Sequence, residues 1–289
     1  MTSVQNWIAG ARPKTLGAAL APVLIGTSIA INQDSFMPVN AGLALVVALF
    51  LQIAVNYAND YSDGIKGVDA NRVGPIRLVG SGLAPAARVK MAAIYCVLIA
   101  SVSGLVLSLR TELWLVLVGL IAILASWAYT GGKNPYGYRG FGEVSVFLFF
   151  GFVATVGTGF VQTGKISWVL LFASIPVGLL AMALLVVNNL RDIETDEKAN
   201  KLTLAVKIGD RKTRLLFIWI ISLSISASLL LAIAAPLVSL SGLTILIAMQ
   251  PMRDVAAGAR KRDLIPTLQQ TNKLMIIQAV LISIGFIFS

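Results

Sequence analysis

The sequence predicts an all-α integral membrane protein with nine transmembrane helices. The chain is 57% hydrophobic and 12% charged, with a mean hydropathy of +0.85, whereas a soluble domain carries about 25% charged residues. Apolar runs of about 18 residues or more recur along the chain, and each is long enough to cross a hydrocarbon core about 30 Å thick. No segment as large as a soluble domain remains between them, so residues 1–289 are expected to form a single polytopic domain.

The expected spans follow one another with short connections, and their boundaries carry an error of about two to four residues. The first run contains Pro22 and no convincing cleavage site, so it is expected to be a retained span rather than a signal peptide. Pro251 ends or kinks the eighth run, and Lys273 shortens the ninth. The nine runs are 16–33, 40–59, 89–109, 113–130, 143–163, 167–190, 214–235, 236–252 and 268–288.

Lysine and arginine are distributed unevenly about these spans. The N-terminus and the 2–3, 4–5, 6–7 and 8–9 connections hold 21 of the 23 basic residues, and the opposite side holds only Arg110 and Lys165. Positive charge marks the cytoplasmic side of a membrane protein. The N-terminus is therefore expected in the cytoplasm of a multi-pass cell-membrane protein. The net charge of +10 is explained by this asymmetry, and no nucleic-acid partner is expected.

The residue types available limit the chemistry. Cys96 is the only cysteine and lies in an apolar run, so neither a disulfide framework nor a cysteine zinc site is expected. Histidine is absent. Acid–base or metal chemistry must therefore use carboxylates, lysine, tyrosine or groups of the substrate.

Seven of the thirteen acidic residues fall in two clusters, at the expected cytoplasmic ends of spans 2 and 6. The first cluster is NYANDYSDGIKGVD, residues 56–69, and the second is NNLRDIETDEKANK, residues 188–201. Both contain Asn-x-x-x-Asp, a spacing that places the two side chains on one helix face. Carboxylates at a helix C-terminus oppose the helix dipole and repel one another. A single acidic segment of this kind can be a solvated loop, but two matched clusters favour a cation site.

Oxygen ligands without histidine or cysteine suit Mg²⁺, Ca²⁺ or Mn²⁺. Mg²⁺ takes only one or two protein carboxylates and completes its coordination with water and substrate phosphate. Two facing clusters could thus hold two Mg²⁺ ions bridged by a diphosphate. Basic residues in or between the same connections would suit a diphosphate and not a bare cation channel: Arg72, Arg77, Lys133, Arg139, Lys198 and Lys201.

The two acidic motifs resemble those of the UbiA superfamily of intramembrane prenyltransferases, and the resemblance covers nearly the whole chain. It implies a UbiA-like bundle of nine transmembrane helices that uses Mg²⁺ to transfer a polyprenyl group from its diphosphate to an aromatic acceptor. The segments ARPKTLGAALAPVLIG, GPIRLVGSGL and YGYRGFGEV resemble the menaquinone branch in particular. That branch implies 1,4-dihydroxy-2-naphthoate as acceptor, with loss of CO₂ and diphosphate to give demethylmenaquinone.

Site residues follow from this resemblance, position by position. Asp60, Asp63, Asp192 and Asp196 would be catalytic and, with Asp69, would ligate the metal. The spacing of six residues from Asp63 to Asp69 departs from the tighter motif of 4-hydroxybenzoate enzymes. The substrates would contact two asparagines, four basic residues and two tyrosines close to the motifs: Asn59, Asn188, Arg77, Lys133, Arg139, Lys201, Tyr61 and Tyr129.

Other functions remain as alternatives. Within the superfamily, the acceptor could be another aromatic compound such as 4-hydroxybenzoate. A cation-coupled transporter would use the acidic clusters for ions, but it is expected to carry ionisable groups at mid-span, and the predicted span centres hold none. CDP-alcohol phosphotransferases also use membrane Asp clusters, but their opening Asp-Gly-x-x-Ala-Arg is missing. A non-enzymatic assembly factor leaves both clusters unexplained.

Overall fold

The structure is a computed structural model that describes residues 2–67 and 76–289, and within these residues every regular element is a helix. Long helices are joined by short connections, and several short 3₁₀ segments lie at helix ends. The elements are α1 Val4–Ala11, η1 Pro13–Thr15, α2 Gly17–Asn32, α3 Pro38–Ile65, α4 Ala86–Arg110, α5 Leu115–Thr130, η2 Tyr136–Arg139, α6 Gly142–Val146, η3 Phe147–Val153, α7 Ala154–Thr163, α8 Trp168–Lys198, α9 Leu204–Leu230, η4 Leu231–Ile233, η5 Pro236–Thr244, α10 Ile245–Ala256, η6 Lys261–Asp263 and α11 Leu264–Phe288.

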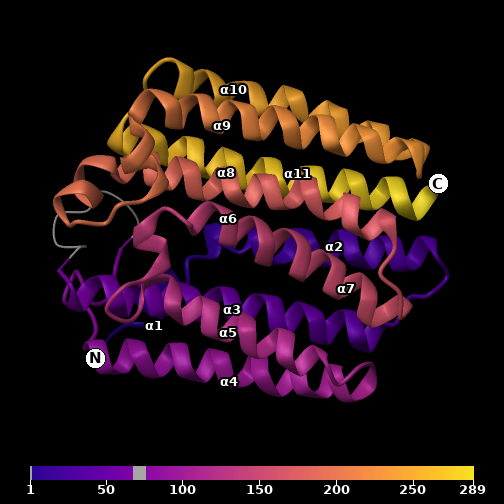
Figure 1. Ribbon diagram of the computed structural model, residues 1–289, viewed down its shortest axis with the longest axis horizontal. Helices are drawn as coiled ribbons and strands as arrows, with labels where there is room; N and C mark the ends of the chain where they lie inside the picture. The colour runs from indigo at the N-terminus through magenta and orange to yellow at the C-terminus, as the bar shows by residue number, and fades with distance from the viewer. Residues whose placement is uncertain (1, 68–75) are drawn as a thin grey trace.

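The long helices lie side by side along the longest axis of the molecule (Figure 1). Helices α8, α9, α10 and α11 form one half of the bundle, α3, α4 and α5 form the other, and α2 contacts both halves. The N-terminus and the C-terminus lie at opposite ends of the bundle (Figure 1). This arrangement places the connections between helices at the two ends, where the polar side chains gather.

The main core lies between α2, α8, α9 and α11. Ile25, Leu180, Phe217 and Leu274 are at most 1% exposed there. Small residues let the helices approach closely: a Cβ added to Gly178 of α8 would lie 3.0 Å from the Cα of Gly151. Without a hydrophobic force between helices in lipid, such close packing is a main source of association. A second, smaller core joins α3 to α4.

The outer surface of the bundle is apolar. Leu98 and Leu109 of α4, Leu117 and Leu124 of α5 and Trp219 of α9 are each more than half exposed. Water-soluble monomers rarely expose contiguous apolar patches larger than a few hundred Å². A surface of this kind along helices of membrane length is typical of contact with lipid, so the fold is that of a multi-pass membrane protein.

The number of spans differs from the prediction in a specific way. Six helices of the described chain are long and apolar enough to cross a membrane alone, and α1–η1 with α2 would make a seventh, bent by 51°. The other two predicted runs are helical but do not meet that length: α5 has 16 residues, and residues 236–256 divide into η5 and α10. The predicted count of nine is therefore not confirmed.

A π-helical segment separates α6 from α7. This segment, η3, consists of six residues with apolar side chains and of Gly151, which lies against α8. The predicted run 143–163 covers all three elements and gives no sign of the wider turn. π-Helical turns frequently occur at functional sites, and this one follows directly after the polar start of α6.

Candidate active site

Two helix ends distant in sequence meet at one end of the bundle. Asp63 lies in the last turn of α3 and Asp196 lies in the last turn of α8, and both are buried. The Nζ of Lys201 lies 3.7 Å from Asp63 Oδ2 and 3.8 Å from Asp196 Oδ1. A single ammonium group thus joins the two acidic motifs, as the prediction of facing clusters requires.

Further polar groups surround Asp63. The Tyr138 hydroxyl donates to Asp63 Oδ1 at 2.6 Å, and an Arg77 nitrogen lies 3.7 Å from Asp63 Oδ2. The Lys66 and Lys201 ammonium groups lie 4.8 Å and 5.2 Å from the centre of the Tyr138 ring. Partial burial lowers the pKa of Lys66 from its usual value, against the opposing effect of Asp63. The centre is thus rich in both carboxylates and cations.

The side chains of the first motif face two different sides of α3. Asn59 accepts from the Thr130 hydroxyl at 2.8 Å, on the side of α3 that carries Asp63. Asp60 instead accepts from the backbone N–H groups of Leu78 and Val79, at 2.7 Å and 2.9 Å. Both Asp60 oxygens therefore bind the chain that follows α3, and its carboxylate is not brought to Lys201.

The side chains of the second motif also lie on two faces of α8, one buried and one exposed. Arg191 donates to both oxygens of Asp192, at 2.8 Å and 2.7 Å, and to the Asn188 side chain at 2.8 Å. Glu194 is 58% exposed on its side chain and pairs with Lys261 at 2.9 Å. Glu194 therefore faces the solvent, whereas Asp192 and Asp196 are buried.

The remaining predicted residues are placed unequally. Lys133 and Arg139 are exposed, and in the described part of the chain their side chains make no hydrogen bond or ion pair. Tyr61 stacks on Trp127, with ring centres 6.3 Å apart, beneath Lys90 of α4. Tyr129 packs edge-on against Tyr136 at 5.5 Å. Asp69 lies outside the described residues.

Four residues near this centre were absent from the predicted site: Lys66, Tyr138, Glu143 and Arg191. Tyr138 and Arg191 stand beside predicted residues in sequence, but their contacts depend on how the connections fold. Glu143 carried a sequence signal that was missed. It is an ionisable residue at the start of a run that carries no other charge before Lys165, and such residues are functional candidates by default.

The donor set fits a hard divalent cation. Among the residues the structure describes, no three carboxylates converge on one point. Two carboxylates, Asp63 and Asp196, face the same ammonium group, and Mg²⁺ is typically held by one or two carboxylates together with substrate phosphate and water. The Lys201 ammonium thus marks a position of negative potential between the motifs.

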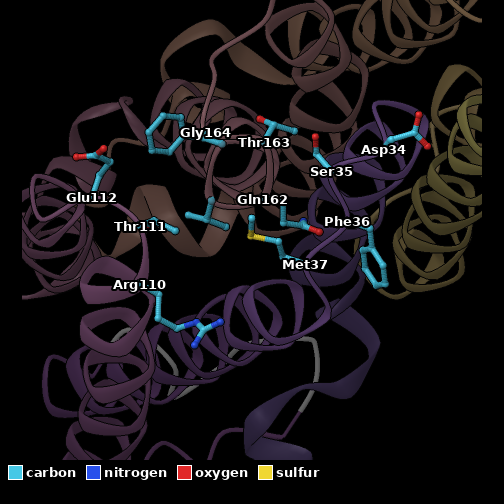
Figure 2. Close-up of a pocket in the computed structure, with 12 residues that line it drawn as sticks. Asp34, Ser35, Phe36, Met37, Arg110, Thr111, Glu112, Gln162, Thr163 and Gly164 are labelled. Atoms are coloured by element: carbon cyan, nitrogen blue, oxygen red, sulfur yellow. The ribbon is translucent and has the colours of Figure 1, made fainter.

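One cavity of the described chain lies away from this centre. It has a volume of about 500 Å³ and is lined by residues from the α2–α3, α4–α5 and α7–α8 connections, among them Met37, Arg110 and Gln162 (Figure 2). Met37 precedes α3, whereas Asp63 lies 26 residues further along, roughly 39 Å at 1.5 Å per residue. This cavity is therefore at the end of the bundle opposite the acidic centre.

The comparisons with known proteins show the family and the fold of the chain. The model of the UbiA prenyltransferase family matches residues 19–266. Two curated relatives, each named 1,4-dihydroxy-2-naphthoate octaprenyltransferase, come from Mycobacterium tuberculosis and Mycobacterium leprae. Both are 44% identical to this chain over 283 residues, which is 98% of this chain and 97% and 96% of the respective relatives. The chain therefore belongs to the UbiA prenyltransferase family, and the resemblance of its motifs is confirmed.

The fold of the chain is also similar to solved structures. A UbiA homologue from Archaeoglobus fulgidus, determined with GPP and Mg²⁺ bound, superimposes with a TM-score of 0.72 at 16% identity, covering 98% of this chain and 99% of that one. At this level of identity the likeness establishes the helical UbiA fold and nothing about substrates.

Proposed function

We propose that the protein transfers a polyprenyl group from polyprenyl diphosphate to 1,4-dihydroxy-2-naphthoate, with loss of CO₂ and diphosphate, to give demethylmenaquinone. The observation that carries the proposal is the meeting of Asp63 and Asp196 at Lys201. The activity named for the mycobacterial relatives supports the choice of acceptor. The tail of the product is hydrocarbon, and this accounts for an enzyme placed in the membrane.

Asp63, Asp192 and Asp196 are proposed to bind the diphosphate through Mg²⁺, and Arg77 and Lys201 to contact its oxygens directly. Bound Mg²⁺ would neutralise charge that develops on the leaving diphosphate. The two basic side chains would act on the same charge from within a buried site, where fixed charges stabilise a transition state best. The predicted role of Asp60 as a further ligand remains a proposal, and its present contacts favour a role in holding the chain after α3.

The reaction begins when the bond between prenyl C1 and the diphosphate oxygen weakens. An allylic cation develops and must be kept from water, and aromatic faces stabilise such a cation. Tyr129 and Tyr138 lie by the acidic centre, whereas Tyr61 lies against Trp127. We therefore favour Tyr129 and Tyr138 for this role. The naphthoate ring then attacks C1, and departure of CO₂ from the attacked carbon restores aromaticity.

The finer topology belongs to the same proposal. Nine crossings, with the N-terminus in the cytoplasm and the C-terminus outside, would put the acidic centre at the cytoplasmic face of the cell membrane. The N-terminus and the C-terminus lie at opposite ends of the bundle (Figure 1), and this supports an odd number of crossings. Residues 1–289 would form one domain.

The test is to incubate the purified protein with Mg²⁺, a polyprenyl diphosphate and one acceptor at a time, and to identify products by mass spectrometry. The expected product with 1,4-dihydroxy-2-naphthoate is the prenylated, decarboxylated naphthol. Product with 4-hydroxybenzoate alone would reassign the acceptor. Full turnover in excess EDTA would contradict the metal-dependent site.

A further inference from the structure

Glu143 is a buried carboxylate that the diphosphate site does not use. Its residue is 1% exposed, at the start of α6. The Asn189 side-chain amide donates to Glu143 Oε1 at 2.9 Å. Its second oxygen, Oε2, is buried and has no hydrogen-bond partner among the residues the structure describes. A buried acceptor without a donor is unfavourable, so Oε2 is a position at which a ligand's donor would be stabilising.

Glu143 adjoins the acidic centre. Its partner Asn189 precedes Asp192 by three residues and Asp196 by seven, so the three side chains share one face of α8. Counted along the helix, Asn189 lies about 4.5 Å deeper into the bundle than Asp192. Glu143 is thus placed just beyond the acidic centre, on the side of the apolar helix interior.

Tyr129 connects the two sites. Its hydroxyl lies in the electrostatic field of Glu143, Asp63 and Asp196 together. A Cβ added to Gly142, the neighbour of Glu143, would lie 3.2 Å from that hydroxyl. The absence of a side chain at Gly142 therefore leaves Tyr129 beside the start of α6.

The local fold fixes the position of Glu143. η3 follows α6 directly and packs against α8, with Gly151 and Gly178 in close approach. On the other side, Tyr136 of η2 and Ser145 of α6 share a hydrogen bond of 2.8 Å between their hydroxyl oxygens. α6 is therefore held from both directions, and Glu143 is presented by a rigid element.

We infer that Glu143 binds the hydroxyl next to the carboxylated carbon of the aromatic acceptor and acts as the proton acceptor of the reaction. The inference rests on the proposed function, since it needs an acceptor with a free ring hydroxyl. That hydroxyl donates to Oε2, and Asn189 orients the carboxylate through Oε1. Transfer of the proton raises the electron density of the ring at the carbon that attacks.

Each bond change is accounted for. The hydroxyl proton moves to Glu143, the ring carbon bonds to prenyl C1, and the C1–O electron pair leaves with diphosphate. The carbon that bore the hydroxyl is then a ketone carbon, and its ring neighbour carries both the prenyl group and the carboxylate. The bond to the carboxylate breaks, CO₂ leaves, and the electron pair forms an enolate. The enolate takes the proton back from Glu143, which ends in its starting state.

Glu143→Gln tests the inference, because it keeps the size of the side chain but cannot accept a proton. Loss of a proton acceptor is worth about 10²–10⁴-fold in rate, so kcat/KM for the acceptor should fall at least about 100-fold. The Kd for a prenyl diphosphate and the melting temperature should stay near those of the unmodified protein. Glu197→Gln, at an exposed acid near the end of α8, is the matched control and should keep full activity.

The second arm of the test uses an acceptor methylated on that hydroxyl, which has no proton to give. The unmodified protein and Glu143→Gln should bind this methylated acceptor with affinities within about twofold of each other. The unmethylated acceptor should bind Glu143→Gln about 10- to 100-fold more weakly than it binds the unmodified protein. If Glu143→Gln does not fold, Glu143→Asp is measured in both arms. Its carboxylate is withdrawn from the hydroxyl by one methylene, so it should lose activity and affinity with the free acceptor, by less than Glu143→Gln would, and bind the methylated acceptor like the unmodified protein.

Two results would overturn the inference. The first is a variant that keeps acceptor kcat/KM within threefold of the unmodified protein. The second is a variant that loses affinity equally for prenyl diphosphate and for both acceptors, since Glu143 would then serve structure alone. Failure of the unmodified protein to prenylate any naphthoate would instead count against the proposed function.

Discussion

Asp60 and Asp63 lie on one turn of α3 and have different surroundings. Asp63 faces Tyr138, Arg77 and Lys201, whereas both Asp60 oxygens accept backbone N–H groups. We predict that Asp63→Asn lowers turnover about 10- to 100-fold with little change in melting temperature, because a charge-assisted contact worth about 1.5–3 kcal/mol is lost.

The Asp60→Asn variant should instead lose more melting temperature and less turnover than Asp63→Asn. The Asn side chain turns a donor toward one of the two backbone N–H groups, and an unsatisfied buried donor costs about 1–3 kcal/mol of stability. Thermal unfolding in detergent, measured for both variants at equal protein concentration, checks the pair. Equal melting temperatures with equal loss of activity would show that both carboxylates act on the substrate.

On α8, we predict that Asp192→Asn lowers turnover about 10- to 100-fold, because the lost charge acts in the transition state. Glu194→Gln should leave turnover near that of the unmodified protein, since Glu194 faces outward and pairs with Lys261. Both variants are assayed at saturating Mg²⁺ and equal expression. Similar damage in both would mean that only the bulk negative charge of the segment matters.

Spacing alone predicted which residues of the second motif face inward, because the helix continues without a break to Lys198. It failed to separate Asp60 from Asp63, since the partners of Asp60 come from Leu78 and Val79, about 18 residues away. Contacts of that kind depend on how a connection returns to its helix. Lys133 and Arg139 show the same limit: a basic residue in the right connection can still face the solvent.

At the scale of elements, composition located every apolar run but could not tell a long helix from an interrupted one. Residues 236–252 carry no charged side chain, yet the first nine form a 3₁₀ segment that begins at Pro236. Composition does not reveal the π-helical turn η3 either, because its residues are apolar like those of an ordinary membrane helix. Hydrogen-bond pattern, and not polarity, distinguishes these elements.

The contact between η3 and α8 gives a prediction at this scale. A Cβ at Gly178 would lie 3.0 Å from the Cα of Gly151 and 3.1 Å from the backbone oxygen of Phe147, and backbone gives way poorly. We expect Gly178→Ala to destabilise the protein by about 1–3 kcal/mol, as overpacking does. Gly157→Ala is the control, since a Cβ there has no heavy atom within 4 Å. Thermal unfolding of the two variants should separate them, and equal melting temperatures would argue against the tight η3–α8 contact.

At the scale of the whole molecule, the distribution of charge about α8 predicts how this helix is oriented in the membrane. α8 has 31 residues and is roughly 46 Å long, more than the hydrocarbon core of a bilayer. Lys165 precedes it on the side with two basic residues, and Glu197 lies near its other end, on the side with 21. By the positive-inside rule, we expect that second end of α8 in the cytoplasm.

Single-cysteine labelling tests this orientation. The only native cysteine, Cys96, is buried, so Cys96→Ser provides a background without reactive thiols. In that background, we predict that Lys165→Cys reacts with a membrane-impermeant maleimide on intact cells, and that Glu197→Cys reacts only after permeabilisation. Both positions are exposed, so a difference in labelling reports the side of the membrane and not burial. Labelling of both residues from outside would mean that α8 does not cross. The reverse pattern would place the acidic centre outside, where a diphosphate made in the cytoplasm could not reach it.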